Sequence, residues 1–507
     1  MPVHSLRLRA ARRLAFTACL AAPAVVAAQV PTAAATLLGN RIANGLRPAV
    51  RITGERDTSF TITERMRRYH VSGVSVAVIE NYQVVWARGF GTTEFGGRDR
   101  VDTATLFLAG SISKPVFASG ALALVEQGTL SLDGDVNATL TSWKLPPSDF
   151  TVTEKVTLRR LLSHSAGTTV WGFPGYELGK PVPTVPQLLS GEKPANTGAV
   201  KSFAVPGKSW MYSGGGYTIA QLLVTDVTGE PFPALMQRLV LGPLGMRASG
   251  YEQDLTAARA RLAAAGHEHG DTVVPGRYHV YPEMAAAGLW TTASDLARWA
   301  IMVARASRGT TGLPLSPAMA RAMLTPQIML PPAFAGPMGR AWGLGVTLAG
   351  AGDSLVFSHG GRDEGFVATM LMYPERGRGL VVMTNGVSGA LLNEITYAFD
   401  EAMGLRTMPR AEKVLTATRD AGAEATIAGA YRLKIGTDSI TYDVRQHAAR
   451  LWLVRSSADS TEWLPQGPDL FFTRESAGDI RIQRLNGRVS SFTVENGAQR
   501  TTFARVP

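Results

Sequence analysis

The chain has 507 residues, of which 45% are hydrophobic, 18% are charged and one is a cysteine. This composition excludes general disorder and a collagen-like sequence, and the length allows a large buried core. A single cysteine excludes a disulfide scaffold and metal sites built from two or four cysteines. The net charge of +11 would suit nucleic-acid binding, but after residue 28 the positive charges are dispersed without a basic block. We therefore expect no nucleic-acid partner.

The N-terminal segment 1–28 has the pattern of a secretory signal. Four arginines within 7–13 precede an apolar run over 14–28 that contains no acidic residue. Small residues before Gln29 would permit cleavage there, and the run is shorter than a membrane span requires. Cleavage would remove Cys19 and the four arginines, lowering the net charge from +11 to +7. We predict a protein that is exported to a bacterial periplasm and soluble once this signal is removed.

Periodic patterns after the signal predict alternating strands and helices. Residues 29–56 begin with an alanine-rich stretch and are predicted to be a linker into the first helix. Segments 73–79 and 83–89 predict an antiparallel hairpin, and 113–127 predicts a helix that ends before Gly128. Further helices are expected at 217–228, 232–241, 293–306 and 389–403, strands at 354–358, 366–373 and 379–384, and Pro/Gly-rich loops around a cleft at 171–200 and 308–343.

This order of elements indicates an α+β domain followed by a second domain. The early hairpin and the late strands predict one sheet made from both ends of the segment 57–410. From about residue 426, short strand-like segments separated by polar turns indicate a small all-β domain over 426–507. Residues 411–425 are the expected linker. The strand-like segments of the second domain are 440–444, 451–454, 480–483 and 490–494.

The start of the predicted helix at 113–127 carries a serine and a lysine three residues apart. Ser111 and Lys114 would lie on one face of a helix, so the amine can take the hydroxyl proton near the positive helix N-terminus. A second pair, Ser190 and Lys193, precedes a proline in a loop, where this spacing has no helical meaning. The alternative for Ser111 is a helix N-cap beside a solvated lysine.

A second segment of interest, Trp210-Met-Tyr212-Ser-Gly-Gly-Gly, precedes the predicted helix at 217–228. Three glycines allow a close approach of another segment. Tyr212 could accept or relay a proton if a nearby cation such as Lys114 lowers its pKa from about 10. The alternative is a glycine turn whose tyrosine packs on the next helix.

The third segment, His359-Gly360-Gly361-Arg362, follows the predicted strand at 354–358. Two glycines after an edge strand would let a substrate lie along the backbone, where an amide can donate to a developing oxyanion. His359 is the best placed histidine for polarising or relaying a proton. A plain glycine turn is the alternative.

Taken in order, these segments resemble the serine β-lactamase-like hydrolases, a family that includes class C β-lactamases, family VIII esterases and D-aminopeptidases. The resemblance rests on Ser111-x-x-Lys114, Tyr212 and His359-Gly-Gly. It covers roughly residues 60–405 and includes matching segments at 70–79, 158–167, 287–296 and 381–385.

The resemblance implies a β-lactamase/transpeptidase-like mixed sheet flanked by helices, with a helical lobe that forms the cleft. It also implies a covalent acyl-enzyme on Ser111, acid and base duties shared by Lys114 and Tyr212, and an oxyanion hole from the amides of Ser111 and Arg362. It implies no cofactor and no metal. His164 lies in a matching segment and is interpreted as structural.

Two departures from the family pattern bear on the substrate. Gly214 stands where β-lactamases have the asparagine of Tyr-x-Asn, and His359-Gly360-Gly361 replaces Lys-Thr-Gly. The first change removes an amide that would hold the substrate. The second replaces a permanent cation by a titrating imidazole. Both changes argue against efficient antibiotic hydrolysis and leave ester or small amide hydrolysis open.

Two further patterns suggest other chemistry and are disfavoured. Gly-Val-Ser388-Gly-Ala approximates the nucleophile elbow of α/β-hydrolases, but the only histidine downstream, His447, lies in the predicted all-β domain. His267, His269 and Asp271 have the spacing of metal ligands on a strand, but a solvated polar loop is the favoured explanation.

We therefore expect an exported serine hydrolase that cleaves an ester or amide bond in a small molecule or a peptidoglycan-related substrate. A β-lactamase or peptidoglycan D-peptidase is the alternative within the family. A catalytically silent cell-wall-binding protein is the alternative of another class. The sequence does not fix the physiological substrate, the oligomeric state or the role of the C-terminal domain.

Overall fold

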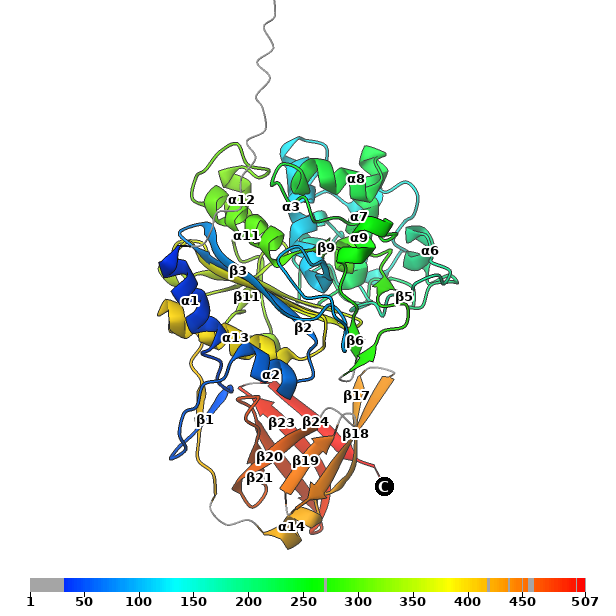
Figure 1. Cartoon of the computed structure of the whole chain (residues 1–507). Helices are drawn as coiled ribbons and strands as arrows, with labels where there is room; N and C mark the ends of the chain where they lie inside the picture. The colour runs from blue at the N-terminus through cyan, green and yellow to red at the C-terminus, as the bar shows by residue number, and fades with distance from the viewer. Residues whose placement is uncertain are drawn as a thin grey trace, which may run out of the picture.

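The structure is a computed structural model that describes residues 32–268, 271–416, 420–435, 438–448, 450–454, 460–497 and 499–506. A domain of helices and strands occupies the upper part of Figure 1, and a closed β-barrel lies below it. The predicted signal, 1–28, lies outside the described residues.

An eight-stranded sheet forms the centre of the larger domain, in the order β10-β11-β12-β13-β14-β15-β2-β3. Every pairing between its neighbouring strands is antiparallel. β15 pairs with β2, so the sheet joins the early hairpin to the late strands, as predicted. The strands are β2 (Gly73–Glu80), β3 (Gln83–Gly91), β10 (Ile328–Met329), β11 (Ala341–Trp342), β12 (Thr347–Ala349), β13 (Val356–Asp363), β14 (Phe366–Tyr373) and β15 (Arg378–Thr384).

Both faces of this sheet are buried, and β2 shows how its sequence achieves this. Val74, Val76 and Val78 pack in one hydrophobic cluster, whereas Ala77 and Ile79 pack in another. Alternate residues of a strand point to opposite faces, so an uninterrupted apolar strand serves two cores. α1, α2 and α13 belong to the layer on the first face, and α11 covers the second (Figure 1). These helices are α1 (Ala33–Ala43), α2 (Ile62–Arg68), α11 (Ala293–Ser307) and α13 (Gly389–Met403).

A buried ion pair ties α2 to α13. The Arg65 guanidinium donates through Nε to Glu394 Oε2 at 2.6 Å, and the Tyr69 hydroxyl donates to Glu394 Oε1 at 2.7 Å. Arg65 is 8% exposed and Glu394 is 1% exposed. The charges of this pair are therefore satisfied by each other, not by water.

A helical lobe packs beside the sheet, with α3 at its centre (Figure 1). Residues 113–124 of α3 are all buried, so the start of this helix is held firmly in place. The helices of the lobe and its surroundings are α3 (Ser113–Glu126), α4 (Val136–Thr139), α5 (Leu158–Leu162), α6 (Val185–Ser190), α7 (Gly214–Thr228), α8 (Phe232–Met236), α9 (Ala257–Leu262), α10 (Met284–Ala287) and α12 (Pro317–Met323). Short strand pairs β4–β9 (Phe107–Leu108, Trp290–Thr291), β5–β8 (Tyr176–Glu177, His279–Val280) and β6–β7 (His267–Glu268, Thr272–Val273) connect them.

The C-terminal domain is a closed antiparallel barrel, which agrees with the predicted all-β domain. Trp463, Phe492 and Tyr431 fill its interior. β24 contacts the short turn η4 (Pro332–Phe334) of the larger domain. The barrel strands are β17 (Gly429–Ile435), β18 (Asp438–His447), β19 (Arg450–Val454), β20 (Ser460–Gly467), β21 (Leu470–Phe472), β22 (Asp479–Leu485), β23 (Arg488–Asn496) and β24 (Gln499–Arg505).

Both predicted linkers contain regular structure, so those expectations were wrong in detail. The segment 29–56 contains α1, whose Thr32 N-cap accepts from Ala35 N, and β1 (Val50–Ile52). The segment 411–425 contains β16 (Ala411–Lys413), which pairs in parallel with β1, and α14 (Ala421–Ala425). Strand β1 and the adjoining β16 connect the two domains through a small apolar cluster of Val50, Ile52, Leu464 and Phe472.

The ends of several other helices and strands also differ from the predicted ones. The helix expected at 232–241 is α-helical only to Met236 and continues as a π-helical turn over Gln237–Leu241. The predicted loop 308–343 contains α12, β10 and β11. The strand expected at 354–358 spans Val356–Asp363, so Gly360 and Gly361 lie within β13 and not in the glycine turn that was the alternative.

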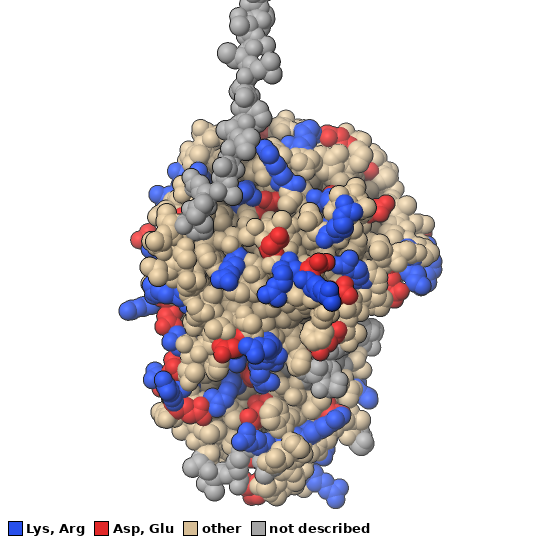
Figure 2. All heavy atoms as spheres, viewed as in Figure 1, with Lys and Arg blue, Asp and Glu red and all other residues tan. Residues whose placement is uncertain are grey.

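Charged side chains of both signs are interspersed on the face shown in Figure 2. Arg308 and Glu375 form one of the exposed ion pairs. No helix in the described part of the chain has the length and apolar composition needed to cross a membrane.

Candidate active site

The structure brings Ser111 and Lys114 into direct contact. Ser111 lies in a 3-10 turn, Gly110–Ile112, and Lys114 is the second residue of α3. Lys114 Nζ lies 3.0 Å from Ser111 Oγ and donates a second hydrogen bond to Ala286 O at 2.8 Å. The predicted pairing across one helical turn is therefore present, with the serine just before the α-helix and not inside it.

Burial changes the chemistry of this lysine. Lys114 is 2% exposed, and desolvation, partly opposed by the carboxylate of Asp363, lowers its pKa to about 7. Burial in a low dielectric disfavours the charged form of an amine. A substantial fraction of Lys114 is thus neutral near pH 7 and able to accept the Ser111 proton.

Tyr212 lies against the same serine. Its hydroxyl hydrogen-bonds with Ser111, and its ring centroid is 5.0 Å from Lys114 Nζ. Burial nevertheless raises the pKa of Tyr212 well above 10. The condition that a cation such as Lys114 lowers this pKa is not met, because desolvation of the phenolate is the largest effect on it and raises it. Tyr212 is a protonated donor at ordinary pH.

His164 holds Tyr212 and the next residue in place. Its ring lies 4.1 Å from the Tyr212 ring at an interplanar angle of 33°, and its Nδ1 accepts from Ser213 N at 3.0 Å. Burial lowers the pKa of His164 well below its usual value, so the ring is neutral. His164 therefore has a structural role, as predicted: it holds the Ser213 backbone and the Tyr212 ring in place.

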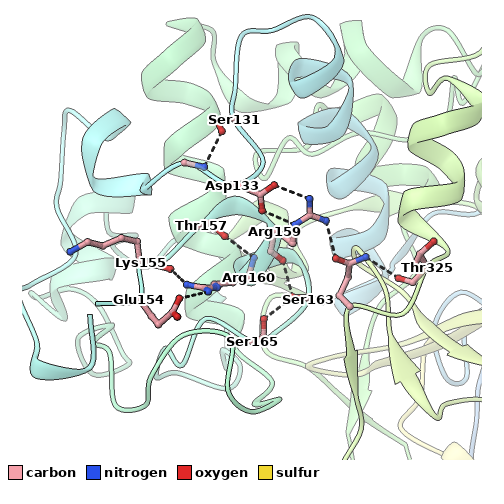
Figure 3. A network of polar contacts seen from close by, with 12 residues as sticks. Ser131, Asp133, Glu154, Lys155, Thr157, Arg159, Arg160, Ser163, Ser165 and Thr325 are labelled. Atoms are coloured by element: carbon pink, nitrogen blue, oxygen red, sulfur yellow. Dashed lines mark hydrogen bonds and ion pairs between the residues drawn. The ribbon is translucent and has the colours of Figure 1, made fainter. Parts of the chain in front are cut away.

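Short helix α5 leads directly into His164, and a polar network anchors it (Figure 3). Arg159 donates to Asp133 Oδ1 and Oδ2 at 2.7 and 2.8 Å and to Gln327 Oε1 at 2.9 Å. Ser163 Oγ donates to Arg159 O at 2.8 Å. The helix that ends directly before His164 is thus tied both to the segment after α3 and to the segment before β10.

Strand β13 passes close to Ser111 because two glycines permit it. A Cβ on Gly361 would lie 1.9 Å from Ala109 O, and a Cβ on Gly110 would lie 2.4 Å from Arg362 N. Asp363 pairs with Phe366 across a two-residue turn. In this register the Arg362 amide points away from β14 and towards the 3-10 turn that carries Ser111. The arrangement suits two amides, of Ser111 and Arg362, as oxyanion donors. The Arg362 side chain is exposed.

His359 lies on β13 beside the cleft but does not titrate near neutral pH. It is 5% exposed. Burial and the nearby Lys114 charge lower its pKa to about 3. Its Nδ1 donates to Gly360 O at 2.6 Å, which leaves Nε2 unprotonated and without a hydrogen-bond partner among the described residues. The expectation of a titrating imidazole was therefore wrong, and His359 offers a neutral acceptor.

The position of Gly214 is filled by an aromatic ring. A Cβ on Gly214 would lie 2.8 Å from Phe173 Cε2 and 3.1 Å from Trp171 O. The space that an asparagine side chain would need in β-lactamases is thus occupied, and the cleft wall there is apolar.

These groups line a cleft of about 650 Å³. Its walls include Ser111, Tyr212, His359, Gly360, Gly361 and Arg362, together with Trp171, Phe173 and Trp342. Two buried acids lie near the base of the site: burial raises the pKa of Asp363 well above its usual range and that of Glu283 to about 8. The predicted catalytic and substrate-binding residues therefore lie together in one cleft, apart from Lys114, which is buried behind Ser111.

The competing patterns have structural explanations. Ser190 ends α6 and accepts from Trp143 Nε1 at 3.2 Å, and Ser388 is the N-cap of α13. His267 is engaged at both ring nitrogens, with Asn385 O at 2.7 Å and Phe95 N at 2.9 Å. His269 lies outside the described residues, and within the described ranges no group of three His, Cys, Asp or Glu side chains has the arrangement of a metal site.

Comparison with known proteins places the fold and site in context. A family model described as Beta-lactamase matches residues 60–401. The chain belongs to the beta-lactamase family. This membership confirms the resemblance to β-lactamase-like serine hydrolases that the ordered motifs predicted.

Two curated proteins are similar in sequence to part of the chain. It is 26% identical to an unguisins hydrolase of Aspergillus violaceofuscus, covering 64% of this chain and 60% of that protein. It is 30% identical to esterase EstB of Burkholderia gladioli over 40% of this chain and 53% of the esterase. The chain therefore spans a little over half the length of these curated relatives.

A solved structure supports the fold over most of the chain. The octameric penicillin-binding protein homologue from Pyrococcus abyssi aligns with a TM-score of 0.60 at 22% identity, covering 87% of this chain and 98% of that one. This likeness shows the β-lactamase/transpeptidase-like fold with an additional all-β domain.

Sequence reasoning missed several residues that shape the cleft. Trp171, Phe173 and Trp342 lie within segments predicted only as loops around a cleft. Their aromatic character among Pro and Gly residues was the available signal. Glu283 and Asp363 gave no signal, because burial of a carboxyl group depends on distant segments of the chain.

Proposed function

We propose that the protein is an exported serine hydrolase that cleaves an ester or amide bond through an acyl-enzyme on Ser111. The observation that carries this proposal is the 3.0 Å contact between Ser111 Oγ and a buried lysine whose pKa is about 7. An amine that is partly neutral at working pH is what nucleophilic activation of a hydroxyl requires.

In the proposed reaction, Ser111 Oγ attacks the carbonyl carbon while Lys114 Nζ takes its proton. The amides of Ser111 and Arg362 stabilise the oxyanion, and one such donor typically contributes about 2.7–4 kcal/mol. Tyr212 donates a proton to the departing alcohol or amine. The Lys114 ammonium then returns its proton to the Tyr212 phenolate. Water then cleaves the acyl-enzyme, which releases the acid and restores Ser111.

The decisive experiment is intact-mass spectrometry with a fluorophosphonate probe. A single adduct on Ser111, absent in Ser111→Ala, supports the proposal. A wild-type protein that is folded and unlabelled would favour the catalytically silent cell-wall-binding alternative. Hydrolysis of p-nitrophenyl esters, a D-amino-acid amide and nitrocefin then ranks the bond types.

A β-lactamase or peptidoglycan D-peptidase is the second candidate. The name of the Pyrococcus abyssi homologue favours it. The neutral His359 and the filled space at Gly214 disfavour it, because neither provides the cation or amide that would bind a β-lactam. We expect nitrocefin turnover to be weak beside that of simple esters.

Export is proposed from residues 1–28. Expression of the full chain in a bacterium should yield periplasmic protein whose N-terminus, read by Edman degradation, is Gln29. Retention of Met1 on cytoplasmic protein would contradict this part of the proposal.

A further inference from the structure

A second groove adjoins the catalytic cleft and is lined largely by aromatic rings. It has a volume of about 470 Å³ and shares Trp171, Tyr212, Trp342 and Thr347 with the catalytic cleft. We call it the aromatic groove; its further walls include Trp210 and Phe334. Among the described residues that line it, none is an Asp, Glu, Lys or Arg.

The rings of this groove form one continuous surface. Trp210 lies 4.9 Å from Phe334 and 5.7 Å from Trp342, and Trp171 lies 5.0 Å from Tyr212, all between ring centroids. Trp171 is 53% exposed and Phe334 is 49% exposed. Large aromatic rings left side by side in water beside a cleft mark a ligand-binding surface.

The wall that carries Phe334 is built into the fold. Leu330 N donates to Arg340 O at 3.0 Å and Gly336 N to Gly339 O at 2.7 Å, which closes the segment on itself. Ser358 Oγ of β13 donates to Met338 O at 3.0 Å. The barrel supports the same wall, because β24 contacts η4, which ends at Phe334.

The catalytic chemistry indicates which end of the substrate reaches this groove. Tyr212 hydrogen-bonds with Ser111 and borders both cavities. If it protonates the leaving atom, as the proposed function requires, the departing group begins at Tyr212, and the adjoining surface is the aromatic groove.

We propose that the aromatic groove binds the leaving group of the substrate, an alcohol or amine that carries a large apolar, preferably aromatic, substituent. This inference rests on the proposed hydrolase function. Burial of such a substituent should raise kcat/KM by about tenfold or more relative to a methyl leaving group. A larger acyl group is not expected to gain from this groove, because the acyl group does not bind there.

The test compares two ester series on the full-length protein. In the first series the acyl group is acetyl and the alcohol is methanol or 2-(2-naphthyl)ethanol. In the second series the alcohol is methanol and the acyl group is acetyl or 2-naphthylacetyl. Each series is assayed with wild type, Phe334→Ala, Trp171→Ala and Phe150→Ala, the last a matched control whose 41% exposed ring lies on the helical lobe away from both cavities.

The proposal requires the ratio of kcat/KM for naphthylethyl to methyl acetate to fall about fivefold or more in Phe334→Ala and Trp171→Ala. It also requires that ratio to stay at its wild-type value in Phe150→Ala. An unchanged ratio in both groove variants, or a loss confined to the acyl series, would overturn it. A protein that turns over no ester and gives no Ser111 adduct would instead refute the proposed function.

Discussion

The depressed pKa of Lys114 makes the pH dependence of acylation a direct test of its role. Neutral lysine is the proposed base, so kcat/KM should follow its fraction, which at a pKa of about 7 is about 9% at pH 6, half at pH 7 and about 91% at pH 8. We expect kcat/KM to rise about tenfold between pH 6 and 8 and to reach a plateau near pH 8.5. A lysine at its ordinary pKa of 10.5 would instead give a rate that rises about tenfold per pH unit up to pH 9 and about eightfold from pH 9 to 10.

The assay is kcat/KM for p-nitrophenyl butyrate from pH 5.5 to 10, corrected for spontaneous hydrolysis. This parameter reports groups of the free enzyme. Because burial raises the pKa of Tyr212 far above 10, no descending limb is expected below pH 10.

Two variants separate Lys114 from its surroundings. Lys114→Arg carries a permanent charge and should be silent at every pH. Glu283 has a pKa of about 8, so the inflection near pH 7 must persist in Glu283→Gln if Lys114 is its source. An inflection above pH 9 in wild type, or activity retained in Lys114→Arg, would refute the assignment of Lys114 as base.

Three further outcomes follow from contacts described above. Tyr212→Phe should lower kcat/KM for esters by about 10²–10⁴ with an unchanged circular dichroism spectrum; wild-type turnover would remove Tyr212 from proton transfer. His164→Ala leaves Ser213 N unpaired and removes the ring against Tyr212, so the free energy of unfolding should drop by about 1–3 kcal/mol in urea titrations and kcat should fall with it. Unaltered values of both would contradict the positioning role. Glu394→Ala strands the buried guanidinium of Arg65 and should cost about 3–5 kcal/mol, whereas Glu375→Ala, in an exposed pair with Arg308, should cost less than about 1 kcal/mol. Equal losses in those two variants would show that burial of the pair is irrelevant.

The sequence predicted the order of the fold well because its strongest signals are periodic. The apolar run of β2 and the helical pattern after Ser113 dictate burial by themselves. The order of the elements, with strands at both ends of the domain, predicted that the early and late strands share one sheet. Helix caps were harder to place: α7 begins at Gly214, three residues before the predicted start, because Ser213 caps it and accepts from Gly216 N.

The candidate catalytic residues were predicted from their spacing, but their protonation states were not. Nothing in the residues around Lys114 or Tyr212 gives the depth of their burial, which is supplied by segments such as α10 and β13. For the same reason the sequence suggested a titrating His359, whereas its enclosure holds the ring neutral. Desolvation is a property of the whole fold and cannot be read from a local motif.

The support that β24 gives to η4 separates two kinds of evolutionary change in this protein. Under the proposed function, substitutions around Ser111 would alter how fast a bond is broken. Substitutions on β24 would shift Phe334 and so alter which leaving groups the aromatic groove accepts. Reactivity and selectivity would then change through different domains of one polypeptide.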